Sequence, residues 1–262
     1  MKRGLIVYNA IDTKKNQWFI DKCLSLLNDD GHSLSYLEEK QLLDYVKKHN
    51  VDYVIYRGRD SRLLEQLENR GIKTFNNATT NIIANDKWLT VKLLERLDLP
   101  HISSFLDSKN LSYPFIMKSI SGHGGQEVFL IKNDNMQRQV LKQNPGKSFI
   151  YQDYLGNDGD VRLYVLDDKV IAAVKRVNAD DYRNNFSLGG EVSIFKPNKA
   201  MIECALLIAK ELQSTFIGVD FLLTKDGFRI IEIEDPVGSR MLYQISNIDI
   251  IKMYCEIIKE KI

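Results

Sequence analysis

The chain reads FIGVDFLLTKDGFRIIEIEDPVGSR at residues 216–240, which predicts two apolar strands joined by a tight turn at Asp226-Gly227. Asp220 lies on the first strand, whereas Glu232 and Glu234 lie two positions apart on the second. Because side chains alternate between the two faces of a strand, both glutamates point to the same face. The hairpin therefore gathers three carboxylates on otherwise apolar strands.

Buried carboxylates are costly unless a cation or hydrogen-bond donors receive them. Their oxygens are the hard ligands that Mg²⁺ prefers, together with substrate phosphates. We therefore interpret Asp220, Glu232 and Glu234 as metal ligands, and we expect them to repel one another in the metal-free protein. The alternative is a solvated strand face on which the glutamates merely alternate with Ile231 and Ile233.

A glycine-rich loop lies further upstream, in SISGHGGQEVFLI at residues 119–131, between two predicted strands. Gly122, Gly124 and Gly125 free the backbone to present N–H groups to an anion and to move as a flap. Lys118 ends the preceding apolar strand and would place its ammonium group beside that anion. An ordinary turn with a solvated lysine is the alternative. No GK[ST] follows, so the loop is not a Walker loop.

Basic side chains occur on the two strands predicted between the loop and the hairpin. Arg162 lies in DVRLYVLD (160–167), and Lys175 with Arg176 lies in KVIAAVKRV (169–177). A basic strand face on a nearly neutral protein indicates an anionic ligand. Ion pairs with the acidic hairpin would explain the same residues equally well.

The first 75 residues alternate short apolar runs with amphipathic stretches, which is typical of a small doubly wound α/β layer. GLIVYN (4–9) and VDYVIYR (51–57) read as strands, and 16–28 reads as a helix. No GxGxxG follows the first strand, so nothing indicates dinucleotide binding.

Beyond a polar stretch from Asn76 to Asp86, a helix is predicted from Lys87 to Leu97, and antiparallel hairpins then mix with helices. The expected fold class is thus α/β plus α+β. We expect three parts, covering residues 1–80, 81–156 and 157–262.

Composition excludes several classes of function. The 262 residues hold 36 Lys and Arg against 35 Asp and Glu, so no global field favours nucleic acid or an anionic membrane. No apolar run approaches the roughly 20 residues of a bilayer span, and we expect a cytoplasmic protein. The three cysteines have no CxxC spacing, and we expect buried free thiols.

The order of these motifs resembles the ATP-grasp superfamily, and most of all its RimK-like carboxylate–amine ligases. A lysine after an Asn-Asp pair is followed by a lysine before a glycine-rich flap and by a Gln-acid-aromatic strand. DVR, KR, YRNN, GVD and an E-x-E pair follow in that order. The resemblance spans about residues 76–240. It implies an ATP-grasp fold, with 1–80 as a pre-ATP-grasp domain, 81–156 as the small lobe with the flap, and 157–262 as the lobe with the metal site.

The resemblance implies a nucleotide site made of two phosphate-binding lysines, the flap, a hinge against adenine and ribose, and the DxR and KR strands. The matching positions are Lys87, Lys118, Ser121, Gly122, Gly124, Gly125, Gln152, Asp153, Tyr154, Leu155, Asp160, Arg162 and Lys175. Asp220, Glu232 and Glu234 match a two-magnesium site, with Mn²⁺ as an alternative ion. Arg183 and Asn185 match the loop that grips the acyl phosphate and the terminal phosphates, and Arg240 would assist them.

The implied activity is ATP-dependent ligation of a carboxylate to an amine through an acyl phosphate, on an amino acid or peptide. The alternatives are an ATP-grasp phosphotransferase that acts on a hydroxyl and a non-catalytic ATP-binding protein. Small-molecule or peptide substrates are expected, and self-association is common in the family. The sequence departs from the family's E-x-N at Glu234 and from its usual continuation at 235–240. Arg57, after an N-terminal strand, would contact substrate or form a structural ion pair.

Overall fold

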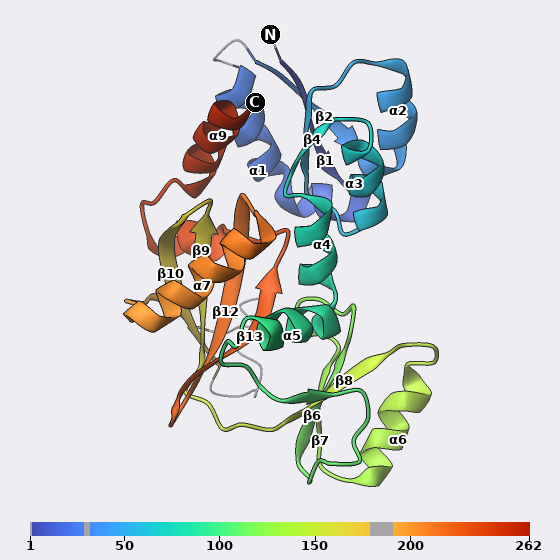
Figure 1. The fold of residues 1–262 in the computed structure, drawn as a ribbon, viewed down its shortest axis with the longest axis vertical. Helices are drawn as coiled ribbons and strands as arrows, with labels where there is room; N and C mark the ends of the chain where they lie inside the picture. Colours follow the sequence, from blue (N-terminus) through green and yellow to red (C-terminus); the bar gives the residue numbers. More distant parts are fainter. Residues whose placement is uncertain (1, 29–31, 179–190) are drawn as a thin grey trace.

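The computed structural model describes residues 2–28, 32–178 and 191–262. Their strands form three separate sheets. Figure 1 shows these sheets following one another along the longest axis of the molecule, with the C-terminal sheet in the middle. No helix in these ranges is both long enough and apolar enough to cross a membrane.

The N-terminal sheet is parallel in the order β2-β1-β3-β4, as the alternating sequence pattern predicts. Its elements are β1 (Arg3–Tyr8), α1 (Ala10–Asn28), β2 (Ser33–Glu38), the 3₁₀ helix η1 (Glu39–Gln41), α2 (Leu42–Lys48), β3 (Tyr53–Tyr56), α3 (Ser61–Glu68) and β4 (Lys73–Phe75). β1 and β3 are almost wholly buried, which explains their uninterrupted apolar runs. Helix α1 begins six residues before the predicted start.

Two consecutive helices, α4 (Ala78–Asn85) and α5 (Lys87–Arg96), connect this sheet to the next part of the chain. The sequence pattern predicted α5 but not α4. The polar residues at 76–86 give no helical pattern of apolar residues, so α4 is not evident in the sequence. Asn77 caps this helix by accepting a hydrogen bond from the Thr80 amide (2.7 Å). Other asparagines of this segment bind across to the C-terminal part of the chain.

The small antiparallel sheet has the order β5-β8-β6-β7, and one helix packs on it. Its elements are β5 (Ser104–Phe105), β6 (Phe115–Ser119), β7 (Val128–Ile131), α6 (Asp134–Gln143) and β8 (Phe149–Asp153). The glycine-rich loop joins β6 to β7 at the end of this sheet.

The C-terminal sheet has the order β11-β10-β9-β12-β13, and all its neighbouring strands are antiparallel. Its elements are β9 (Asp160–Leu166), β10 (Lys169–Val177), β11 (Glu191–Ile194), α7 (Lys199–Leu212), β12 (Phe216–Thr224), β13 (Gly227–Glu234), α8 (Arg240–Ile245) and α9 (Ile250–Lys261). The predicted β12–β13 hairpin is present, with Gly227 at φ +112° in its turn.

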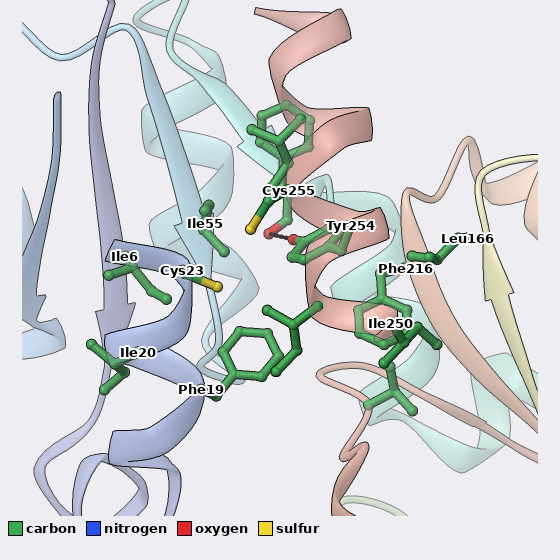
Figure 2. Close-up of a cluster of buried hydrophobic side chains, with 14 of the residues drawn as sticks. Ile6, Phe19, Ile20, Cys23, Ile55, Leu166, Phe216, Ile250, Tyr254 and Cys255 are labelled. Atoms are coloured by element: carbon green, nitrogen blue, oxygen red, sulfur yellow. Dashed lines mark hydrogen bonds between the residues drawn. The ribbon is translucent and has the colours of Figure 1, made fainter. Parts of the chain in front are cut away.

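The largest hydrophobic core crosses from the N-terminal sheet to the C-terminal sheet. Figure 2 shows Phe19 and Cys23 of α1 facing Tyr254 and Cys255 of α9, with Phe216 of β12 beside them. The expectation of free, buried thiols is confirmed for all three cysteines. The core therefore joins the two ends of the chain into one packed body.

Candidate active site

The three predicted carboxylates meet at one place on the C-terminal sheet. Oxygen atoms of Asp220, Glu232 and Glu234 all lie within 4.8 Å of one another. Asp220 and Glu232 are direct partners in the β12–β13 pairing, and Glu234 follows two residues later on the same face. The expected grouping is confirmed, and a set of three hard oxygen donors fits a magnesium ion.

A β-bulge on β13 shapes this group. The pairing shifts between Asp220 and Phe221, so Ile231 has no partner of its own. Bulges bend a strand and redirect its side chains. Ile231 thus lines the same pocket as Glu232.

Two buried arginines neutralise the carboxylates. Arg162 of β9 donates to Asp220 Oδ1 and Oδ2 (2.7 and 2.6 Å) and to Glu234 Oε1 (2.6 Å). Arg176 of β10 donates to Asp220 Oδ2 (2.7 Å) and to Asp160. The ion-pair interpretation of the basic strand face therefore holds for both arginines. The expected repulsion is present, because Asp220 acts to raise the pKa of Glu232 and of Glu234, but the two arginines offset it at Asp220.

The pKa values of the carboxylates reflect this pairing. Burial alone would raise the pKa of Asp220, but Arg162 and Arg176 lower it to about 2. Burial raises the pKa of Glu234, and Arg162 only partly opposes that shift. Asp220 is therefore held in its ionised form by the two guanidinium groups that it already contacts.

Two lysines approach the cluster from the other side. Lys87, the first residue of α5, lies 3.0 Å from Glu232 Oε1 and also donates to the Gly122 carbonyl of the flap. Lys118 lies near the end of β6, where burial is the main cause that lowers its pKa to about 8. Two cations thus line the same pocket as Asp220 and Glu232, and ammonium groups in such a place are suited to binding phosphate.

The first pocket, here called the hinge pocket, lies between the flap and the end of β8. Both lysines line it, together with Gly122, Gly125, the hinge residues Gln152, Asp153, Tyr154 and Leu155, and Asp160, Arg176, Asp220 and Glu232. Gln152 donates to Ser104 Oγ (2.7 Å), whereas its buried Oε1 has no partner among the described residues. An acceptor left free in this place fits a ligand with N–H donors.

Sequence reasoning missed the apolar walls of the hinge pocket, which are formed by Ile102, Ile116, Val128, Leu222 and Ile231. Two of them had a signal in the sequence. Ile116 is two residues before Lys118 and Leu222 is two residues after Asp220, so strand alternation places each on the face of its functional neighbour.

The second pocket, here called the interdomain cavity, has a volume of about 420 Å³ and is lined in part by Glu232 and Glu234. Its walls come from α1, from the residues after β3, from the flap and from the segment after β13. They include Tyr8, Asp12, Lys15, Arg57, Arg59, Gly124, Arg162, Glu234, Asp235 and Arg240. His123, Arg176 and Glu232 line both pockets, which therefore meet at the carboxylates.

Four residues that were predicted for the nucleotide site do not line the hinge pocket: Ser121, Gly124, Arg162 and Lys175. Gly124 and Arg162 line the interdomain cavity instead. Ser121 is exposed on the flap. Lys175 pairs with Val161, on the face of β10 opposite to Arg176, and lines neither pocket. Arg183 and Asn185 lie outside the described residues.

Arg57 lines the interdomain cavity and also has a structural role, through hydrogen bonds and not the expected ion pair. Its side chain is buried and donates to the Val237 carbonyl (2.6 Å) and to Tyr8 Oη (3.2 Å). The guanidinium also lies 4.6 Å from the centroid of the Phe19 ring. It therefore connects the N-terminal sheet to the segment that follows Glu234.

Comparison with known proteins agrees with this geometry. The sequence model of one protein family, the RimK-like ATP-grasp domain, matches residues 84–258. The chain belongs to this family. An uncharacterized protein of Mycoplasma genitalium is 32% identical to it over 254 residues, covering 93% of this chain and 88% of that protein.

A probable alpha-L-glutamate ligase of Haemophilus influenzae is 25% identical to this RimK-like chain over 202 residues, covering 72% of the chain and 68% of the ligase. Among solved structures, a RimK domain ATP-grasp protein of Sphaerobacter thermophilus superposes with a TM-score of 0.79 at 15% identity, covering 97% of this chain and 98% of that one. The expected ATP-grasp fold is confirmed. The chain is therefore a member of a family of ATP-grasp ligases.

Proposed function

We propose that this protein is a carboxylate–amine ligase that joins its two substrates through an acyl phosphate. The observation that carries the proposal is that the hinge pocket and the interdomain cavity meet at Arg176, Glu232 and His123. A nucleotide in the first pocket would direct its terminal phosphate toward a carboxylate in the second. Catalysis would consist mainly of positioning and charge neutralisation.

ATP would lie with its adenine between the apolar walls of the hinge pocket and its phosphates beside Lys87 and Lys118. Asp220, Glu232 and Glu234 would hold two Mg²⁺ ions, with Mn²⁺ as a substitute. The ions would neutralise the phosphate charge. Asn185 would assist the lysines, as the family resemblance implies.

The reaction would proceed in two steps. A carboxylate oxygen of the acid attacks the γ-phosphorus, the bond between that phosphorus and the bridging oxygen breaks, and ADP leaves. The amine nitrogen then attacks the acyl carbon, inorganic phosphate leaves, and the nitrogen loses a proton. Arg162 and Arg240 line the cavity where the acyl phosphate would form, and their guanidinium groups would receive its charge, assisted by Arg183.

The acid substrate is proposed to be an amino acid or peptide that carries an additional carboxylate. Lys15, Arg59 and Arg240 line the interdomain cavity on the side of α1 and α8. Their positive charges complement an anionic substrate. The alpha-L-glutamate ligase among the relatives supports the same chemical class.

Hydroxylamine trapping tests the proposal. Incubation with Mg²⁺–ATP, hydroxylamine and a panel of acidic amino acids and peptides should yield a hydroxamate, because hydroxylamine intercepts an acyl phosphate. Glu232→Gln, which removes one of the proposed metal ligands and whose ion pair is with Lys87 and not with a buried arginine, is the inactive control. ADP release without hydroxamate would instead indicate the phosphotransferase. Absence of ADP release with every acid would indicate a non-catalytic ATP-binding protein.

A further inference from the structure

The segment immediately after the metal ligand Glu234 is held by asparagine side chains from the 76–85 segment. Asp235 is only 5% exposed. Its Oδ1 accepts a hydrogen bond from Asn76 Nδ2 and its Oδ2 accepts one from Asn81 Nδ2, each at 2.8 Å. Asn85 Nδ2 donates to the Asp235 carbonyl at 2.7 Å. Three asparagines thus hold one residue at the end of the acidic hairpin.

The next residues of the segment are held in the same way. The Val237 carbonyl accepts from Arg57, and the Gly238 carbonyl accepts from Tyr164 Oη of β9 at 3.0 Å. Donors from three different parts of the chain therefore fix the backbone between Glu234 and Arg240. Both of these flanking side chains line the interdomain cavity.

The orientation of Asn76 explains why an acceptor is needed at position 235. Its Oδ1 accepts from the amides of Thr215 (2.6 Å) and Phe216 (2.9 Å), and its Nδ2 also donates to the Phe216 carbonyl (2.7 Å). The amide cannot turn without losing these bonds, so its Nδ2 always faces Asp235. Asn81 Nδ2 is shared in a similar way between Asp235 and the Gly58 carbonyl (3.1 Å). A carboxylate offers one acceptor oxygen to each donor.

We propose that Asp235 is a positioning residue that ties the Glu234 end of the metal cluster to the asparagines of the 76–85 segment. This inference rests on the proposed function, because it assigns a task to the same metal site. Asp235 lines the interdomain cavity but not the hinge pocket, and its two carboxylate oxygens accept from Asn76 and Asn81. Its two bonds to Asn76 and Asn81 hold the backbone from which Glu234 and Arg240 project. Residues remote in sequence would thereby set the geometry of the metal ligands.

Asn81→Leu tests the proposal without changing any charge or any metal ligand. It leaves Asp235 Oδ2 without its donor, so the affinity for Mn²⁺ in the presence of a non-hydrolysable ATP analogue should fall about tenfold or more, as for other residues that orient metal ligands. Binding is measured by electron paramagnetic resonance of free Mn²⁺. Nucleotide affinity without metal should change less than about twofold, because the hinge pocket is untouched.

Asp235→Asn provides a second, milder variant. The amide oxygen that it introduces can still accept from Asn76, whereas the amide nitrogen faces the Asn81 donor. The reciprocal double variant Asn81→Asp with Asp235→Asn restores the donor–acceptor pair between these two residues but not the bond to the Gly58 carbonyl, so it should recover part of the Mn²⁺ affinity that Asn81→Leu loses. Such a rescue would not follow from a general loss of stability.

Asn77→Ala is the matched control. Asn77 lies at the start of the same helix and also bonds across the chain, to the Leu212 carbonyl (2.8 Å), but it does not contact Asp235. The Asn77→Ala substitution should lower the melting temperature of the protein and leave its Mn²⁺ affinity unchanged. Parental Mn²⁺ affinity in both Asn81→Leu and Asp235→Asn, or an equal loss in Asn77→Ala, would overturn the positioning role. Hydroxamate formation by the parent would stand in either case, so failure of this inference is distinct from failure of the ligase proposal.

Discussion

At the scale of single residues, Lys118 shows how a binding site can lower the stability of the fold that carries it. Burial is the main cause that lowers its pKa to about 8, Glu232 opposes the shift, and Lys87 adds to it. An unfolded lysine has a pKa of about 10.4. The unfolded chain therefore binds more protons between these two values, and the free energy of unfolding rises with pH in that window. Below pH 8 the folded protein carries the full cost of the charged group.

Lys118→Met should therefore raise the free energy of unfolding at pH 7, by about 1 to 3 kcal/mol. The gain should vanish as the pH approaches the pKa of the free lysine. The same change should weaken ATP binding by roughly 1 to 3 kcal/mol, because a charged hydrogen bond to phosphate is lost. Urea denaturation at pH 7 and pH 10, with calorimetry of ATP binding, measures both effects.

Lys132→Met, at an exposed strand end, is the control and should alter neither quantity. A Lys118→Met protein that is no more stable than the parent at pH 7 would show that Lys118 is well solvated. Parental ATP affinity would remove Lys118 from the phosphate site.

The three carboxylates differ from what their residue types alone suggest about stability. Three neighbouring carboxylates suggest that removal of one would relieve repulsion. However, Asp220 receives hydrogen bonds from both Arg162 and Arg176, which are themselves buried. Removal of its charge would leave two buried guanidinium groups short of a partner, and such losses are strongly destabilising.

At the scale of secondary-structure elements, the start of β9 depends on one glycine. Gly159 has φ +103°, and a Cβ atom built on it would lie 2.5 Å from the Arg176 carbonyl oxygen. The next residue, Asp160, pairs with Arg176 across β9 and β10. The close approach of these backbones thus holds the arginine at the edge of the hinge pocket.

Gly159→Ala should destabilise the protein by about 1 to 3 kcal/mol, because alanine is strained at this φ and collides with backbone. It should also weaken Mg²⁺–ATP binding, since β10 must shift and carry Arg176 with it. Thermal denaturation and calorimetry measure the two effects. Gly156→Ala is the matched control, because nothing lies within 4 Å of its added Cβ atom. Equal behaviour of both variants would contradict the close-contact argument.

At the scale of the whole molecule, the hydrophobic core that contains Phe19, Phe216 and Tyr254 joins the N-terminal and C-terminal sheets. The hydrogen bonds of Asn76 and Arg57 to the C-terminal part cross the same boundary. A shared core and buried polar contacts of this kind favour a single cooperative transition for the two sheets.

Trp18 on α1 and Trp88 on α5 allow this cooperativity to be measured. Single-tryptophan variants made with Trp18→Phe and Trp88→Phe should show coincident urea midpoints by fluorescence. Phe216→Ala should lower both midpoints together, with a loss of about 3 to 5 kcal/mol, because it opens a cavity in the shared core. Separate midpoints, or a shift confined to the Trp18 signal, would show that the N-terminal sheet unfolds independently.

Local sequence patterns were enough to predict the parallel N-terminal layer, the β12–β13 hairpin and the common face of Glu232 and Glu234. These features follow from periodicity over a few residues, which a linear sequence displays directly. Lys118 could be singled out because it ends an apolar strand just before the glycine-rich loop, whereas Lys87 was identified only through the resemblance of the whole ordered series of motifs to the family. The polar helix α4 could not be predicted, because its asparagines form hydrogen bonds with residues that are distant in the sequence.

Contacts between distant segments settled the remaining features of the site. Strand alternation allows only one of Lys175 and Arg176 to face the carboxylates, and the pairing of Arg176 with Asp160 selects it. Arg57 meets Val237 across 180 residues, and Asp235 meets Asn76 across 159. The physical reason is that a buried polar group must find a partner wherever the fold brings one within hydrogen-bond distance, and no local pattern encodes which partner that will be.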